Sequence, residues 1–291
     1  MGGRGARASR LRERLSGGRQ SVLRALDTIG VVPSGHTTYL GHSFRYPLES
    51  LIGQQIAAGG EWDASLVDIV LEVLPMQVPV VCEVGSNIGA SLLQIKRAKP
   101  HARVLAFEPS DRFRPFLEKN VALAGLADVT VSSSLLGRSP GVVSLYNNVA
   151  SASASRPRDP GDLSPRREQQ VAMTTLDAVL PPATTVDLIK VDTDGFDFEV
   201  LRGAQATIAR QPPVLYFEYF PDLLESPQAE LAWLQTVGYE TFFCFTPSGE
   251  FSGRATDVAK ATRRARLLGY CDVLACPRGS PLEAQVAARY G

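Results

Sequence analysis

From Pro79 onward, short apolar runs alternate with amphipathic helical segments, and this alternation limits the folds open to the chain. The runs VPVVCEV, ARVLAFE, DVTVSSSL, VDLIKVD and PVLYFEY are rich in Val, Ile and aromatic residues, as strands are. Helical patterns such as SLLQIKRAKP and FEVLRGAQATIAR lie between them. Such alternation predicts an α/β fold, a mostly parallel sheet with helices on both faces. Two later runs, ETFFCFTPSGEF and GYCDVLACP, are expected to close the sheet with an antiparallel C-terminal edge strand.

The chain divides near residue 50. Apolar residues recur at near-helical spacing over residues 11–29, which predicts an amphipathic helix with arginines on its wet face. We expect this helix to pack on the main domain or to form a homodimer, with binding to a membrane surface as the alternative. Residues 1–50 are therefore assigned to a basic tail, helix and cap segment, and residues 51–291 to the sheet domain. Within that domain ASASASRPRDPGDLSPRREQQ, residues 150–170, lacks apolar periodicity and predicts a flexible surface loop, either a lid or disordered.

Composition excludes several classes of protein. Thirty basic residues balance thirty acidic ones, which argues against a nucleic-acid partner. The four cysteines show no metal-ligand spacing and lie in apolar runs, so we expect buried free thiols. No apolar run has the roughly 18–20 residues of a membrane span, and the N-terminus lacks a secretory signal pattern, so we expect a cytoplasmic protein without membrane insertion.

The first strand ends in an acid and a glycine turn, VVCEVGSNIGAS. Gly85 and Gly89 are four residues apart, so the turn is neither the three-glycine dinucleotide motif nor a phosphate loop. Glu83 beside the turn would repel a pyrophosphate and attract a cation. The glycines would let the backbone approach a flat, uncharged group such as an adenosine.

The second strand, ARVLAFEPS, ends in Glu108, which precedes Pro109. A carboxylate at this place can accept two hydrogen bonds from a ribose diol. Together, Glu83 and Glu108 predict a nucleoside that carries a positive charge at its other end. S-adenosylmethionine, with its sulfonium and α-ammonium groups, meets that description.

Strands further along supply weaker candidates. Ser133 or Ser134 would bond the edge of the adenine, and Leu135 would cover its face, although serines at strand ends are commonly turn formers. The fourth strand runs into DLIKVDTDGFDFEVLRGA, where Asp192 and Asp194 lie at the expected cleft. With Asp197 these acids could instead bind Mg²⁺, but we assign Asp197 as a solvated or helix-capping residue and predict no metal site. Glu218, at the end of the fifth strand, would face the acceptor.

The ordered motifs VCEVGSNIG, VLAFEPS, VSSSLLGRSPGVVSLY, MTTLDAVL and DLIKVDTDGFDFEVLRGA resemble the FkbM-type S-adenosylmethionine-dependent methyltransferases over roughly residues 50–220. Glu83, Ser86 and Asp194 replace the family's commoner Asp, Ala and Glu. The resemblance implies a seven-stranded class I Rossmann-like fold and O-methylation of a hydroxyl on a sugar or other secondary metabolite. The upstream GGEWD resembles a family segment and adds Glu61 to the cofactor side.

The motifs and the resemblance together predict the site. Asp192 and Asp194 are the catalytic candidates, with His36 and His42 as less favoured bases. The predicted residues for S-adenosylmethionine and its product S-adenosylhomocysteine are Glu61, Glu83, Gly85, Ser86, Asn87, Gly89, Glu108, Pro109, Ser110, Ser133, Ser134, Leu135 and Asp192. The expected acceptor is a small molecule or a glycan. The alternative function is N-methylation of a small-molecule amine or a peptide nitrogen.

Overall fold

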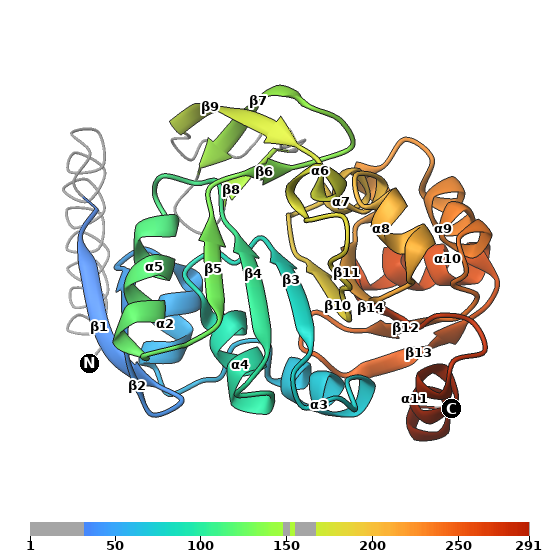
Figure 1. Ribbon diagram of the computed structural model, residues 1–291, viewed down its shortest axis with the longest axis horizontal. Helices are drawn as coiled ribbons and strands as arrows, with labels where there is room; N and C mark the ends of the chain where they lie inside the picture. Colours follow the sequence, from blue (N-terminus) through green and yellow to red (C-terminus); the bar gives the residue numbers. More distant parts are fainter. Residues whose placement is uncertain (1–31, 148–151, 155–166, 291) are drawn as a thin grey trace, which may run out of the picture.

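The computed structural model describes residues 32–147, 152–154 and 167–290 (Figure 1). Its α-helices are α2 (Leu51–Ala57), α3 (Ala64–Val73), α4 (Ala90–Ala98), α5 (Arg114–Leu123), α6 (Leu176–Val179), α7 (Asp197–Arg202), α8 (Gln205–Arg210), α9 (Pro227–Thr236), α10 (Val258–Leu268) and α11 (Pro281–Tyr290), and η1 (Pro221–Leu223) is a 3₁₀ turn. Its strands are β1 (Ser34–Tyr39), β2 (His42–Pro47), β3 (Val80–Val84), β4 (Arg103–Phe107), β5 (Val129–Ser132), β6 (Leu135–Leu136), β7 (Gly141–Asn147), β8 (Ala152–Ser153), β9 (Arg167–Thr174), β10 (Leu188–Val191), β11 (Val214–Tyr219), β12 (Phe242–Phe245), β13 (Phe251–Ala255) and β14 (Cys271–Ala275). Within these ranges no helix has the length and apolar character to cross a membrane.

The main sheet has the strand order β13-β12-β14-β11-β10-β3-β4-β5. The five strands from β11 to β5 run parallel, and β14, β12 and β13 are antiparallel to their neighbours. The predicted α/β class and mostly parallel sheet are confirmed.

The expected antiparallel C-terminal edge is present, formed by β14, β12 and β13, but the described sheet has eight strands where seven were expected. The last strand in the sequence, β14, lies between β11 and β12. Val273, Leu274 and Ala275 are all buried, so both faces of β14 are apolar and favour an interior position. β13 carries the exposed Arg254 and takes the edge, where unpaired backbone groups meet water.

Helices cover both faces of the sheet (Figure 1). One buried cluster joins the sheet to α3, α4, α5 and α11, and a second joins it to α7, α8, α9 and α10. Alternate residues of β3 divide between them, with Val81 in the first cluster and Cys82 and Val84 in the second. All four cysteines are buried and free, as predicted. The two packed faces fix the carboxyl ends of the parallel strands along one edge.

A second sheet, of order β6-β9-β7-β8, lies beyond those carboxyl ends (Figure 1). The predicted loop of residues 150–170 is wrong at both of its described ends. Ala152–Ser153 forms β8, and Arg167 begins β9, which pairs with β7. β9 was missed because its apolar positions, such as the buried Val171, start only after a polar stretch. Residues 155–166 of the expected loop lie outside the described residues.

The N-terminal segment contributes a hairpin of β1 and β2. Asn120 of α5 joins it to the main domain, because its Oδ1 accepts the Arg45 N–H at 2.7 Å and its Nδ2 donates to the Arg45 carbonyl at 2.8 Å. The predicted helix over residues 11–29 and its dimer contact lie outside the described residues. The boundary near residue 50 stays a prediction.

Candidate functional site

The glycine turn after β3 is packed between the ends of β4 and β10. The Gly85 and Ser86 N–H groups both donate to the Phe107 carbonyl, at 3.0 and 3.1 Å. Gly85 has φ +86°, and a Cβ there would lie 1.8 Å from the Asp192 carbonyl oxygen. Only glycine fits this close approach of two backbones. The sequence therefore needs Gly85 for strand packing as well as for the pocket it lines.

Glu108 closes the next strand with a fixed carboxylate. Its Oε2 accepts the Asn87 N–H at 2.8 Å, and its Oε1 accepts the Ser110 N–H at 2.9 Å. The side chain is only 4% exposed. Burial raises the pKa of Glu108 to about 7, against the lowering effect of the two backbone hydrogen bonds. Glu108 is therefore an oriented acceptor whose charge is sensitive to near-neutral pH.

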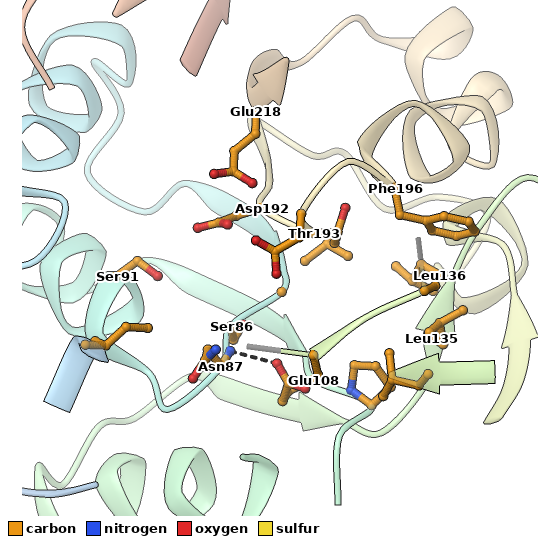
Figure 2. A pocket seen from close by; sticks show the side chains of 18 of the residues that line it. Ser86, Asn87, Ser91, Glu108, Leu135, Leu136, Asp192, Thr193, Phe196 and Glu218 are labelled. Atoms are coloured by element: carbon orange, nitrogen blue, oxygen red, sulfur yellow. Dashed lines mark hydrogen bonds between the residues drawn. The ribbon is translucent and has the colours of Figure 1, made fainter. Parts of the chain in front are cut away.

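A pocket of about 270 Å³ lies at the carboxyl ends of the central strands. In Figure 2 Asp192 and Glu218 point into it from one side, and Glu108 and Asn87 lie across from them. The predicted site residues that line it are Gly85, Ser86, Asn87, Glu108, Pro109, Ser134, Leu135, Asp192 and Asp194. Most of the predicted site thus comes together from four separate strand ends.

Glu83 lies outside the lining of this pocket. It is fully buried, and its Oε1 accepts a hydrogen bond from Ser91 Oγ at 2.6 Å. Its neighbour in strand register is Lys190. Burial raises the pKa of Glu83, and the Lys190 ammonium opposes that shift. The cation beside Glu83 is therefore a residue of the chain, and contact of Glu83 with a cofactor stays a prediction.

Lys190 is itself 1% exposed and is surrounded by acids. Its Nζ lies 2.9 Å from Asp192 Oδ2 and 3.8 Å from Asp63 Oδ2. Burial alone would lower the pKa of Lys190, but the carboxylates of Asp192, Asp63 and Glu83 raise it above its usual range. Lys190 thus holds Asp192 at the pocket edge as an ion pair.

Four other predicted cofactor residues also lie outside the pocket lining. The Glu61 carboxylate is 48% exposed and pairs with Arg97 at 3.2 Å. Gly89 has φ +87° at the start of α4, and a Cβ there would lie 2.8 Å from Leu117 Cδ1. Ser110 is buried, and its Oγ donates to Asn147 Oδ1. Ser133 is exposed. The structure gives Gly89 and Ser110 packing roles.

The two candidate histidines lie on the hairpin. His36 is exposed and bonds Ser43 through Nε2 at 3.0 Å. His42 is half-buried, and neither histidine lines the pocket. The geometry therefore leaves the aspartates as the nearer acid–base groups.

The sequence analysis assigns Asp197 as a solvated or helix-capping acid; it is not solvated, and it is the first residue of α7, whose N-cap is Phe196. Asp197 is 1% exposed and accepts hydrogen bonds from Thr193 Oγ1 at 2.9 Å and from the Gly195 and Glu218 N–H groups at 3.2 and 3.1 Å. Burial raises its pKa to about 7. Asp197 thereby ties the turn after β10, where Asp194 has φ +52°, to β11. Among the described residues, no group of three or more His, Cys, Asp or Glu side chains is arranged to hold a metal ion.

The sequence analysis missed the apolar wall of the pocket. Trp62, Phe196, Tyr270 and Leu145 line it, together with Ala152 and Ala154 near β8. Phe196 directly follows the Asp194-Gly195 turn, and Tyr270 directly precedes β14. An aromatic residue next to a strand end is a signal that could have found both.

A second hollow of about 260 Å³ adjoins the first. The two share Trp62, Asp192, Glu218 and Tyr270 in their linings. The second hollow is bordered by β10, β11 and β14 and by the turn before α3. A molecule in the second hollow would therefore meet one in the first at Asp192 and Glu218.

Comparison with known proteins decides the family. Residues 83–241, more than half of the chain, match the methyltransferase FkbM domain. The chain belongs to the FkbM methyltransferase family. It is an α/β protein with a mostly parallel central sheet.

The individual relatives that match are distant. Methyltransferase 1 of Beauveria bassiana is 29% identical over 143 residues, 42% of this chain and 57% of the relative. Methyltransferase sdnD of Sordaria araneosa is 28% identical over 155 residues, 43% of this chain and 60% of the relative. The crystal structure of methyltransferase FkbM from Methylobacillus flagellatus is 16% identical with a TM-score of 0.45, covering 69% of this chain and 44% of that chain. The match thus spans less than two thirds of either curated relative.

Proposed function

We propose that this FkbM-family chain is an S-adenosylmethionine-dependent O-methyltransferase that acts on a hydroxyl of a sugar, a glycan or another secondary metabolite. The observation that carries the proposal is the buried Glu108 carboxylate, which two backbone N–H groups fix at the wall of the first pocket. A carboxylate held in this way at the end of the second parallel strand is suited to accept hydrogen bonds from a ribose diol.

The residues of the first pocket fit such a cofactor. Asn87 Oδ1 is buried without a hydrogen-bond partner beside Glu108, so a donor on the ligand would satisfy it. Pro109, Leu135 and Leu145 supply an apolar surface for a flat base. A pocket with apolar walls and a few fixed polar groups is typical of nucleoside sites.

The bound cofactor supplies an electrophilic methyl group on a sulfonium. The protein must align the acceptor oxygen with that methyl and remove the hydroxyl proton as the new bond forms. Asp192 is suited to accept the proton, because its side chain lines both hollows. Its carboxylate is oriented by a hydrogen bond from Lys190, whose Nζ lies 2.9 Å from Asp192 Oδ2. Asp194 lines only the first hollow, so we assign it to the cofactor side.

A second candidate function is methyl transfer to an amine nitrogen. The observation that favours it is the excess of carboxylates in the second hollow, where Asp63, Glu218 and Asp272 join Asp192. Mass spectrometry and NMR of the methylated product distinguish transfer to oxygen from transfer to nitrogen.

The first test is calorimetric titration with S-adenosylhomocysteine, with NAD⁺ as the control ligand. We expect micromolar binding of S-adenosylhomocysteine alone. The variant Glu108→Gln keeps one acceptor oxygen for the backbone N–H groups. It should bind S-adenosylhomocysteine about 10- to 100-fold more weakly, because the hydrogen bonds from the ribose to a charged acceptor are lost. An unchanged melting temperature in the variant controls for folding. Absence of binding to the unaltered protein would refute the methyltransferase assignment.

A further inference from the structure

The second hollow has more negative than positive groups. Its described lining contains the carboxylates of Asp63, Asp192, Glu218 and Asp272, with Glu61 at its exposed rim. Among these lining residues Lys190 alone is cationic, and it already lies within 4 Å of Asp192 and Asp63. Lys190 therefore leaves two of the four carboxylates, those of Glu218 and Asp272, without an ion pair to its ammonium. In the part of the chain that the structure describes, no cationic side chain lies within ion-pair distance of either.

Glu218 and Asp272 are also direct neighbours. They occupy opposite positions in the antiparallel pairing of β11 with β14. Burial and the neighbouring carboxylates raise the pKa of both Glu218 and Asp272 well above the usual range, because like charges at opposite positions of a sheet repel each other. A positive charge placed between the two side chains would favour their ionised forms and would itself be stabilised by them.

Two buried polar atoms of the hollow make no hydrogen bond of normal geometry. Glu218 Oε2 is buried and makes no hydrogen bond. The Tyr216 side chain, 3% exposed, lines the hollow, and its hydroxyl makes no hydrogen bond of normal geometry, although Ser65 is close enough to lower its pKa. Buried polar atoms are normally satisfied, so both atoms indicate a polar ligand.

We propose that the second hollow binds the methyl acceptor and that the acceptor carries a protonated amino group, which Glu218 and Asp272 hold. This inference rests on the proposed function, because it takes the first hollow as the cofactor pocket. Asp192 and Glu218, which both hollows share, would then face the junction of cofactor and acceptor. An acceptor with a phosphate or carboxylate at this place is excluded by repulsion from the same acids.

The acceptor test uses two matched sugars on the protein loaded with S-adenosylhomocysteine. Glucosamine and glucose differ by one ammonium in place of one hydroxyl, so their difference in affinity reports the charge preference of the hollow. We expect glucosamine to bind at least about tenfold more tightly in ligand-detected NMR titrations. Equal affinity for the two sugars, or binding of neither, would overturn the inference.

Single substitutions test which residue causes the preference for glucosamine over glucose. Asp272→Asn should remove most of the preference for glucosamine and leave the affinity for S-adenosylhomocysteine unchanged, because Asp272 lines only the second hollow. Asp222→Asn removes a 71% exposed carboxylate elsewhere and is the matched control, with the preference retained. If Asp272→Asn does not fold, Glu218→Gln, which removes the other proposed acid, should likewise remove most of the preference for glucosamine. A full preference in a folded Asp272→Asn protein would contradict the assignment.

The two proposals fail separately. Binding of S-adenosylhomocysteine without a preference for glucosamine removes the cationic acceptor and keeps the methyltransferase. Absence of S-adenosylhomocysteine binding removes the methyltransferase itself.

Discussion

Glu83 and Lys190 are register partners on adjacent parallel strands, β3 and β10, and both side chains are buried. On the other side of β10, Lys190 is the register partner of Tyr216 on β11. A polar row therefore crosses the centre of the sheet directly beneath the site. Buried charges are stable only when they are paired, so these residues depend on one another.

Removal of the cation from this row should cost more stability than removal of any one acid. Lys190→Met leaves Asp63, Asp192 and Glu83 without their common partner, and we expect a loss of roughly 3–5 kcal/mol at pH 8. Chemical denaturation of the single variants and of Lys190→Met/Glu83→Gln measures the coupling. The double variant should lose less than the sum of the two single losses.

That loss should also depend on pH. Burial raises the pKa of Asp63 from its usual value to about 6 even with Lys190 present. A carboxyl with a raised pKa in the folded protein contributes stability at low pH that is lost as the pH rises through that pKa. Lys190→Met should therefore approach the stability of the unaltered protein at pH 5. An equal loss at pH 5 and pH 8 would contradict the ion-pair interpretation.

Gly85 and Gly41 provide a matched test of the glycine turn. Both have a positive φ, +86° and +83°, but a Cβ at Gly41 meets nothing within 4 Å. Gly41→Ala should cost only the backbone strain of about 1–2 kcal/mol. Gly85→Ala adds a clash with the Asp192 carbonyl and should be far less stable, or fail to fold, in a thermal melt. Equal melting temperatures would show that the two strand ends can separate.

Affinity for S-adenosylhomocysteine should rise with pH between 6 and 8. The pKa of Glu108 is about 7, and the ionised form is the better acceptor for a ribose diol. Below this pKa the affinity should fall by up to about tenfold per pH unit. Titrations at three pH values check the slope, and Glu108→Gln should remove it.

In the protein without ligand, ionisation of Glu108 should lower the stability of the fold, whereas it raises the affinity for S-adenosylhomocysteine. The raised pKa of Glu108, and that of Asp197 at about 7, stabilise the fold at low pH and lose that contribution as the pH rises through 7. The melting temperature of the free protein should therefore fall from pH 6 to pH 8, and S-adenosylhomocysteine should offset the fall. A free protein that becomes more stable over this range would refute the assigned shifts.

Asp192→Asn should reduce turnover by about 10²- to 10⁴-fold, the range for loss of a general base. The affinity for S-adenosylhomocysteine should change little, since Asn keeps the shape of the side chain. Steady-state kinetics with an acceptor found by mass-spectrometric screening give the comparison. Full turnover in the variant would remove Asp192 from the mechanism.

The sequence predicted the parallel half of the fold well because strand and helix periods alternate clearly from β3 to β11. It did not fix the order of β12, β13 and β14 within the antiparallel edge, since an apolar run shows that a strand is buried but not which strands flank it. It missed β9, whose polar start resembles a loop. Local pattern thus gave the elements, and long-range pairing decided their order.

The site shows the same division. Glu108 and Asp192 follow directly from their positions at strand ends, and both line the pocket. Glu83 has a similar position, yet its side chain lies beneath the lining, because strand residues alternate between faces and the register with Lys190 is set by another strand. Asp272 opposite Glu218 could not be foreseen, since antiparallel pairing of β11 with β14 is not encoded locally.

The interior position of β14 has a consequence for the order in which the protein assembles. On the ribosome β12 and β13 emerge before β14, yet β12 has no partner in the central sheet until β14 has inserted beside β11. The five parallel strands can pair while synthesis continues, whereas β14, which carries Asp272, can pair only after it has been synthesised. We expect the nascent chain to form most of the first pocket early, and to complete it with Tyr270 and close the second hollow with Asp272 only when β14 has inserted, with this long-range pairing as the slow step.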